Sequence, residues 1–149
     1  HVGYPSLEQE LEIVERRKKR KADAALLNAV ISPEELAAMR ACVEDVYVHP
    51  DVQRYMLQLV ANTRSHRQVA VGASPRASLS LLKLTRAWAA IHGRTYVVPD
   101  DVKQFAREAL GHRIILEPSL WGSKTTEDAV IDEVLQSMDV PVVPHQHEQ

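Results

Sequence analysis

The sequence predicts an all-α fold, a helical bundle with an appended C-terminal helix. Three observations predict it. Ala and Leu recur along the chain while aromatic residues make up only 5% of it, which favours a helical core of aliphatic side chains. Apolar residues recur at helical spacing, and helix start and stop signals frame these segments. With 45% hydrophobic and 26% charged residues, the 149-residue chain has the composition of one globular domain.

Serine caps predict the starts of the first two helices. Ser6 forms a capping box with Gln9, and the helix that follows ends in the basic run 16–21, where the helix dipole favours cations. Ser32 and Glu35 form a second capping box. The expected apolar faces are Leu7, Leu11 and Val14 in the first helix, and Leu36, Met39, Val43 and Val46 in the second.

Proline-led starts predict the next two helices. The third begins near Pro50 and has a stripe at i, i+3, i+4, i+7 and i+8 spacing, formed by Val52, Tyr55, Met56, Leu59 and Val60. The fourth runs from Ser74-Pro75 to His92, with Gly93 as its stop. Because apolar residues cover most of its circumference, we expect this helix at the centre of the bundle.

The C-terminal part predicts two more helices. One begins after Pro99 and ends at Gly111, and the other covers about residues 125–138. Their apolar faces are Val102, Phe105, Ala106, Ala109 and Leu110, and Val130, Ile131, Val134, Leu135 and Met138. The last helix could pack back on the bundle or on a neighbouring molecule. The sequence also allows a short β-ribbon of segments 46–48 and 96–98, with 114–116 as a candidate third strand.

Composition and missing motifs exclude several functions. The only cysteine, Cys42, excludes an internal disulfide, and we expect it as an inert thiol inside a helix seam. No apolar run reaches the ~18 residues of a membrane span. The formal charge of −2 gives no global electrostatic case for nucleic acid. Because P-loop, His-Glu-x-x-His and nucleophile-elbow motifs are missing, no self-contained active site is predicted.

Arg76 is the main candidate site residue. Ser74 and Pro75 place it in the first turn of the fourth helix, where a cation is disfavoured by ~0.3–1 kcal/mol. An arginine at this position is explained if a phosphate binds there, because unpaired N–H groups attract anions and Arg grips phosphate oxygens with a fork of donors. The alternative is that Arg76 pairs with a carboxylate or lies in solvent.

Other polar groups favour simpler interpretations. The basic run 16–21 is typical of a solvated helix end, and the alternative function is a helical nucleic-acid or protein-binding module that uses it. Asp100-Asp101 is typical of a helix start rather than of an acid/base pair. Of the seven histidines only His145 and His147 are close, in a tail that should be frayed, so no metal site is expected.

Taken in order, a series of blocks resembles the lid portion of MoxR-type AAA+ ATPases, over roughly residues 2–117. The block that contains Ser74-Pro75-Arg76 is the part of the resemblance that is most specific to this family. The blocks are Gly3-Tyr4-Pro5-Ser6-Leu7-Glu8, Ser32-Pro33-Glu34-Glu35-Leu36, Gly72-Ala73-Ser74-Pro75-Arg76-Ala77, Tyr96-Val97-Val98-Pro99-Asp100-Asp101-Val102 and Gly111-His112-Arg113-Ile114.

The resemblance implies a function for these blocks. Arg76 would be the sensor-2 arginine that contacts the γ-phosphate of ATP, with Ser74 and Pro75 beside it. Tyr4 and Pro5 would lie near the adenine, in a hinge of residues 1–5 that leads from a P-loop domain. Residues 6–122 would form the lid domain, and residues 123–149 a linker, a helix and a tail.

The resemblance also implies partners and cofactors. ATP and Mg²⁺ would bind only together with the P-loop domain of the same protein, so this chain alone should be inactive. Neighbouring subunits of a cytoplasmic hexameric ring are expected, together with a protein that carries a von Willebrand A domain, in chaperone-like assembly or cofactor insertion. Because the first residue is His1 rather than Met, we expect a processed chain or an excised piece.

Overall fold

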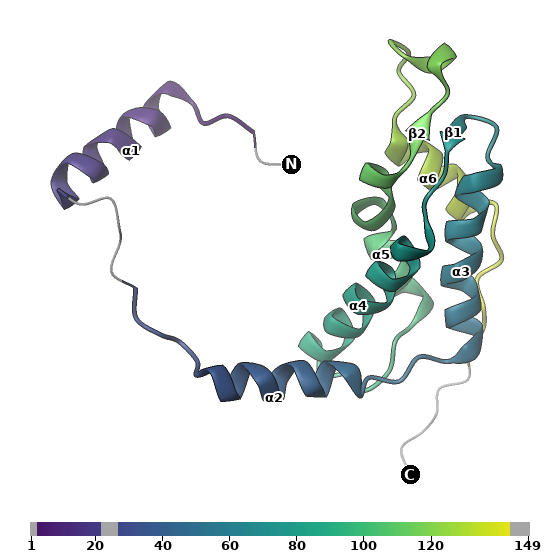
Figure 1. Cartoon of the computed structure of the whole chain (residues 1–149), viewed down its shortest axis with the longest axis horizontal. Helices are drawn as coiled ribbons and strands as arrows, with labels where there is room; N and C mark the ends of the chain where they lie inside the picture. The colour runs from purple at the N-terminus through teal and green to yellow at the C-terminus, as the bar shows by residue number, and fades with distance from the viewer. Residues whose placement is uncertain (1–2, 22–26, 144–149) are drawn as a thin grey trace. The chain divides into compact units, whose positions relative to one another are not determined.

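The computed structural model describes residues 3–21 and 27–143. Its chain contacts divide into two compact units, His1–Leu36 and Ala37–Gln149, and the division falls inside helix α2. In chain order the elements are α1 (Leu7–Arg20), α2 (Pro33–Glu44), α3 (Pro50–Ser65), β1 (Val69–Val71), α4 (Pro75–Ile91), α5 (Pro99–Leu110), the 3₁₀ turn η1 (Gly111–Arg113), β2 (Ile115–Leu116), the 3₁₀ turn η2 (Pro118–Leu120) and α6 (Glu127–Gln136) (Figure 1). The predicted all-α class with a small ribbon is confirmed.

The first unit holds α1 and the start of α2, and both predicted capping boxes form. Ser6 Oγ accepts the Gln9 N–H while the Gln9 side chain accepts the Ser6 N–H at 2.8 Å. Glu35 likewise accepts the Ser32 N–H at 2.7 Å and donates its own N–H to Ser32 Oγ. Within the described residues neither helix buries a side chain, so the predicted faces of α1 and α2 are exposed or only partly covered. The exception is Val46, which lies just after the end of α2 and is buried in the core.

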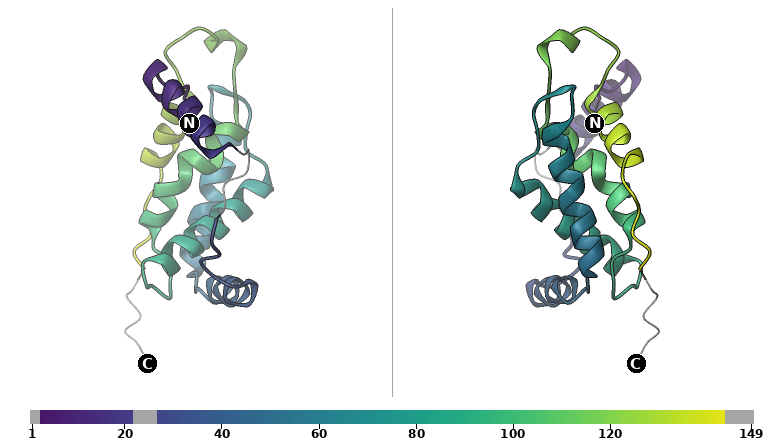
Figure 2. Two further views of the ribbon diagram at one scale, coloured as in Figure 1. Left: turned by 90° about the vertical axis from the view of Figure 1, so that its left-hand side faces the viewer. Right: turned by 90° about the vertical axis from the view of Figure 1, so that its right-hand side faces the viewer.

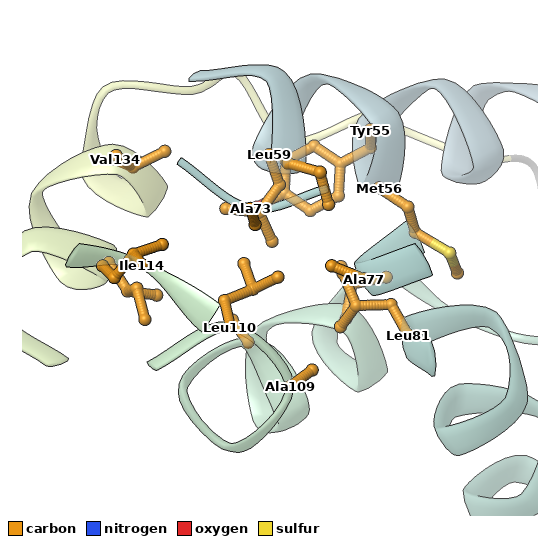
Figure 3. Close-up of a cluster of buried hydrophobic side chains, with 14 of the residues drawn as sticks. Tyr55, Met56, Leu59, Ala73, Ala77, Leu81, Ala109, Leu110, Ile114 and Val134 are labelled. Atoms are coloured by element: carbon orange, nitrogen blue, oxygen red, sulfur yellow. The ribbon is translucent and has the colours of Figure 1, made fainter. Parts of the chain in front are cut away.

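The second unit has one hydrophobic core, built by α3, α4, α5 and α6. Figure 3 shows side chains of α3 opposite those of α4 and α5, with α6 on one side. The whole predicted stripe of α3 is buried, and the predicted face of α5 is buried apart from Phe105, which packs against it. Further core residues are Ala77, Leu81, Ala89, Val130, Ile131 and Val134.

Helix α6 packs back on the bundle, which decides between the two placements that the sequence allowed. It contacts α3 and α5 and buries Val130, Ile131 and Val134. Thr126 caps its first turn by accepting the Ala129 N–H at 3.2 Å. In both views of Figure 2 the loop that follows β2 projects past the ends of these helices.

Helix α4 is less enclosed than its sequence predicts. It packs against α3 and α5 and buries a single stripe of Ala77, Leu81, Thr85 and Ala89. Leu79 and Ile91 remain 59% and 78% exposed. The expected central position therefore holds for the face that packs against α3 and α5 but not for the rest of the helix, because the pattern records apolar surface and not what covers it. Its stop is as predicted, since Gly93 follows the helix with a φ of 68°.

The predicted pairing of segments 46–48 and 96–98 forms, as a single bridge. Tyr47 and Tyr96 form a parallel bridge, in which the Tyr47 N–H donates to the Thr95 carbonyl and the Val97 N–H to the Tyr47 carbonyl. The third candidate segment pairs elsewhere: β2 lies antiparallel to β1, with Val69 opposite Leu116 and Val71 opposite Ile115. The ribbon β1–β2 was not predicted, because two or three residues are too short for a recognisable strand pattern.

A forked ion pair joins the turn after α4 to the start of α5. Both terminal nitrogens of Arg94 donate to the Asp101 carboxylate at 2.7 Å, and Asp101 also accepts the Val98 N–H at 2.9 Å. The side chain of Asp101 is only 5% exposed. The hydrogen bond to Asp101 raises the pKa of Arg94. Asp101 therefore acts in the helix start, as its sequence position predicted.

Tyr55→Phe is expected to keep or slightly raise stability at pH 7, by at most about 1 kcal/mol, because the buried Tyr55 hydroxyl has no hydrogen-bond partner among the described residues. Burial also raises the pKa of Tyr55 above 10.0. The folded state then keeps a proton that the unfolded chain loses, so wild-type stability falls as the pH rises above about 10. Urea unfolding measures how far the free energy of unfolding falls between pH 7 and about pH 10.5, and this fall should be smaller in Tyr55→Phe than in the wild type. Equal falls in the two proteins would contradict this assignment.

Candidate functional site

Arg76 stands at an exposed helix start, as the sequence predicts. Ser74 is the N-cap residue of α4 and Pro75 its first residue. Ser74 makes no side-chain capping bond, and the first turn of α4 contains no acidic residue. Arg76 itself is exposed, and no hydrogen bond or ion pair of its side chain is found within residues 3–21 and 27–143. Pairing of Arg76 with a carboxylate is thus not seen among the residues that the structure describes, while the other simple interpretation, exposure to solvent, agrees with the structure.

The loop before α4 is fastened to the end of α3 through one residue, Ala73. The Ala73 N–H donates to Thr63 Oγ1 at 3.0 Å, and the Ala73 carbonyl accepts from Arg64 Nε at 2.7 Å. Ala73 and Thr63 are both fully buried. Both backbone polar groups of Ala73 are therefore held by consecutive side chains of α3.

Gly72 permits this close approach. A Cβ at Gly72 would lie 2.5 Å from Cα and 2.7 Å from the backbone nitrogen of Arg64, which is closer than carbon atoms pack. The absence of a side chain at Gly72 lets the loop lie directly on the backbone of α3. This explains why a glycine begins the block that contains Arg76.

A second set of hydrogen bonds, made by Ser80 and Arg113, holds the first turns of α4. Ser80 Oγ donates to the Arg76 carbonyl at 3.1 Å and accepts from Arg113 Nη2 at 3.2 Å. Arg113 Nε is buried and has no partner among the described residues. Thr63, Arg64, Ser80 and Arg113 were not predicted from the sequence. Only Arg113 had a signal, because it lies in the last of the resembling blocks.

Tyr4 and Pro5 lie in the other unit, ahead of α1. Both are exposed, Tyr4 completely. Since the two units are not placed relative to each other, the structure does not bring these residues to Arg76. Their role next to the adenine stays a prediction.

The remaining candidates have structural partners or lie on the surface. Asp100 accepts a hydrogen bond from Lys103 at 2.8 Å, which raises the pKa of Lys103. Cys42 is exposed, so the predicted core thiol is wrong; the reason is that α2 buries none of its described side chains. His145 and His147 lie outside the described residues.

The basic run 16–21 forms the exposed C-terminal end of α1. Lys21 is the left-handed C-cap residue, and Arg16 pairs with Glu12 at 2.6 Å. This agrees with a solvated helix end, where cations complement the dipole. A binding function of the run stays a prediction.

The site fits a phosphate better than a metal ion. The uncapped N-terminus of α4 and the guanidinium of Arg76 offer N–H donors and positive charge on one exposed surface. No group of three or more His, Cys, Asp or Glu side chains suited to a metal occurs in the described portion of the chain.

Comparison with known proteins identifies relatives of the chain. The family model described as AAA lid domain matches residues 61–145. The chain is 33% identical to protein YeaC of Bacillus subtilis, covering 95% of this chain and 44% of YeaC. It is also 33% identical to Chaperone MoxR1 of Mycobacterium tuberculosis, covering 96% of this chain and 40% of MoxR1.

A crystal structure of a predicted ATPase from Cytophaga hutchinsonii superposes with a TM-score of 0.79 at 26% identity, covering 95% of this chain and 46% of that one. The chain thus spans less than half the length of these relatives. The matches confirm the resemblance that the sequence blocks indicated. Among the described residues, no helix is long and apolar enough to cross a membrane.

Proposed function

Since the chain belongs to the AAA lid domain family, we propose that it is the nucleotide-sensing lid of a MoxR-type AAA+ ATPase and that Arg76 is its sensor-2 arginine. One observation carries the proposal. Arg76 has no side-chain partner among the described residues and lies in the first turn of α4, at an exposed helix start that no side chain caps. The loop just before this turn is held in place by two side chains of α3. An arginine in this position is explained by an anion that binds there.

The chemistry of the site suits a terminal phosphate. The first N–H groups of α4 carry positive partial charge, which normally disfavours a neighbouring cation by ~0.3–1 kcal/mol. A phosphate bound between the helix N-terminus and the guanidinium turns this unfavourable interaction into a favourable one, because the phosphate attracts both the N–H groups and the guanidinium. Arginine suits this task because its donors form a fixed fork that matches phosphate oxygens.

ATP and Mg²⁺, held by a P-loop domain that this chain does not contain, supply the γ-phosphate and its charge. Arg76 then binds that phosphate from the lid side. The angle of the lid depends on whether the phosphate is present, and residues 1–5 act as the hinge. On this proposal residues 6–122 are the lid domain, and hydrolysis needs the whole protein.

The wider assembly is part of the same proposal. The lid angle would be passed to neighbouring subunits of a hexameric ring in the cytoplasm. A chaperone-like role is supported by the likeness to Chaperone MoxR1. That this role is assembly or cofactor insertion, with a partner that carries a von Willebrand A domain, is proposed from the resemblance of the sequence blocks alone.

Arg76→Ala in the full-length protein is expected to lower the rate of ATP hydrolysis at least about tenfold, which corresponds to ~1.4 kcal/mol of transition-state stabilisation. The measurement is steady-state turnover with circular dichroism as a check on folding. Lys83→Ala is the control, because Lys83 is another exposed cation of α4 and should leave turnover unchanged. Wild-type turnover and nucleotide affinity in Arg76→Ala would refute the sensor role.

A further inference from the structure

We infer that Thr63 and Arg64 are positioning residues: through their hydrogen bonds to Ala73 they fix the direction in which Arg76 leaves α4. The inference rests on the proposed function of Arg76 and extends it to two side chains of α3. Neither side chain reaches the phosphate in this proposal. Both act through the backbone of the loop that starts α4.

The hydroxyl of Thr63 accepts a hydrogen bond from the loop. Thr63 Oγ1 donates its own proton to the Val60 carbonyl at 2.7 Å, so its lone pairs are left for the Ala73 N–H at 3.0 Å. Thr63 is fully buried, so this bond is shielded from bulk solvent. The direction of the hydroxyl is therefore set by α3 itself.

Arg64 holds the other side of the same residue. Its Nε donates to the Ala73 carbonyl at 2.7 Å, a short bond from a charged donor. Bonds to both the N–H and the C=O fix the position and the rotation of Ala73. Because the residues after it are an extended N-cap, Ser74, and a proline with a fixed φ, this orientation carries into the first turn of α4.

Small errors in this orientation should be costly for turnover. Arg76 lies only three positions beyond Ala73, and a misplacement of about 1 Å can lower a rate by about 100-fold in enzyme sites. The exposed Arg76 side chain has no partner among the described residues that would otherwise direct it. The hydrogen bonds that hold Ala73, together with the bond from Ser80 Oγ to the Arg76 carbonyl, thus direct Arg76 before a phosphate binds.

The test compares ATP turnover of full-length variants at a temperature below their unfolding transitions. Thr63→Val removes the acceptor with little change of shape, and Thr63→Ser keeps it. Arg64→Met removes the Nε donor, and Arg67→Met is the matched control, because Arg67 is exposed and has no side-chain bond within the described residues. We expect kcat to fall at least about fivefold in Thr63→Val and Arg64→Met, and to stay within about twofold in Thr63→Ser and Arg67→Met.

A double-mutant cycle separates positioning from a purely structural role. If the two residues act through Arg76, Thr63→Val and Arg64→Met cause no further loss of kcat in an Arg76→Ala background. Losses that multiply with that of Arg76→Ala overturn the inference, as does wild-type kcat in both single variants while Arg76→Ala is impaired. If Arg76→Ala itself keeps wild-type turnover, the proposed function fails instead. Should Thr63→Val not fold, Arg64→Met at the protein surface decides alone.

Discussion

Arg94→Met is expected to lower the free energy of unfolding by about 3 kcal/mol or more, because it leaves the buried carboxylate of Asp101 without its counter-charge. Asp101 would lose two of its three hydrogen bonds and keep only that from the Val98 N–H. The turn between α4 and α5 would lose its cross-link at the same time. Urea unfolding at pH 7 measures the difference directly.

Arg107→Met is the matched control for this prediction. Arg107 also forms a forked pair, donating from Nε and Nη2 to Asp132 at 2.8 and 2.6 Å, but on the surface, with 55% of the Arg107 side chain exposed. Solvent screens this pair and hydrates the carboxylate when its partner is removed, so we expect a loss of at most about 1 kcal/mol. Equal losses in the two variants would show that burial of Asp101 does not decide the cost.

Gly72→Ala is expected to lower stability by about 1–3 kcal/mol and to displace the loop before α4, because the new methyl group overlaps backbone atoms of Arg64. A backbone atom cannot turn aside as the end of a side chain can. The hydrogen bonds of Ala73 to Thr63 and Arg64 should be lost in consequence. Thermal unfolding measures the first effect, and amide hydrogen exchange at Ala73 the second.

Gly93→Ala provides the contrast, because the two glycines are needed for different reasons. A Cβ at Gly93 would meet no atom within 4 Å, but its φ of 68° disfavours a side chain. We expect a loss of roughly 1 kcal/mol and unchanged exchange at Ala73. If Gly72→Ala left exchange at Ala73 as slow as in the wild type, the close approach would not need a glycine.

Helix boundaries were predictable because they depend on neighbours in the sequence. The boxes at Ser6 and Ser32, the start at Ser74-Pro75 and the stop at Gly93 all appear where expected. Each involves residues at most four positions apart, so tertiary contacts hardly alter them. The position of Arg76 in the first turn of α4 was predictable for the same reason.

Burial was predicted less well, since it depends on distant parts of the chain. Leu79, Ile91 and Met39 carry apolar patterns but remain more than half exposed. A periodic pattern shows which face of a helix seeks cover and not which element supplies it. The same limit hid the pairing of β1 with β2, whose strands lie far apart in the sequence.

The supports of the candidate site were missed for a related reason. Thr63 and Arg64 look like ordinary residues at the end of α3, and their distant partner, Ala73, is brought to them only by the loop that passes at Gly72. Arg76 could be singled out because its charge conflicts with its own helix end. No such local conflict marks a residue that acts through a distant peptide group.

The exposed position of Cys42 has a practical consequence for following the lid in solution. The sequence contains a single cysteine, and its side chain on α2 is open to solvent. A maleimide dye or a nitroxide spin label can therefore be attached at one defined point of this chain, without engineering its surface. In full-length protein labelled at that point, fluorescence or electron resonance would record in real time whether α2 moves when nucleotide is exchanged.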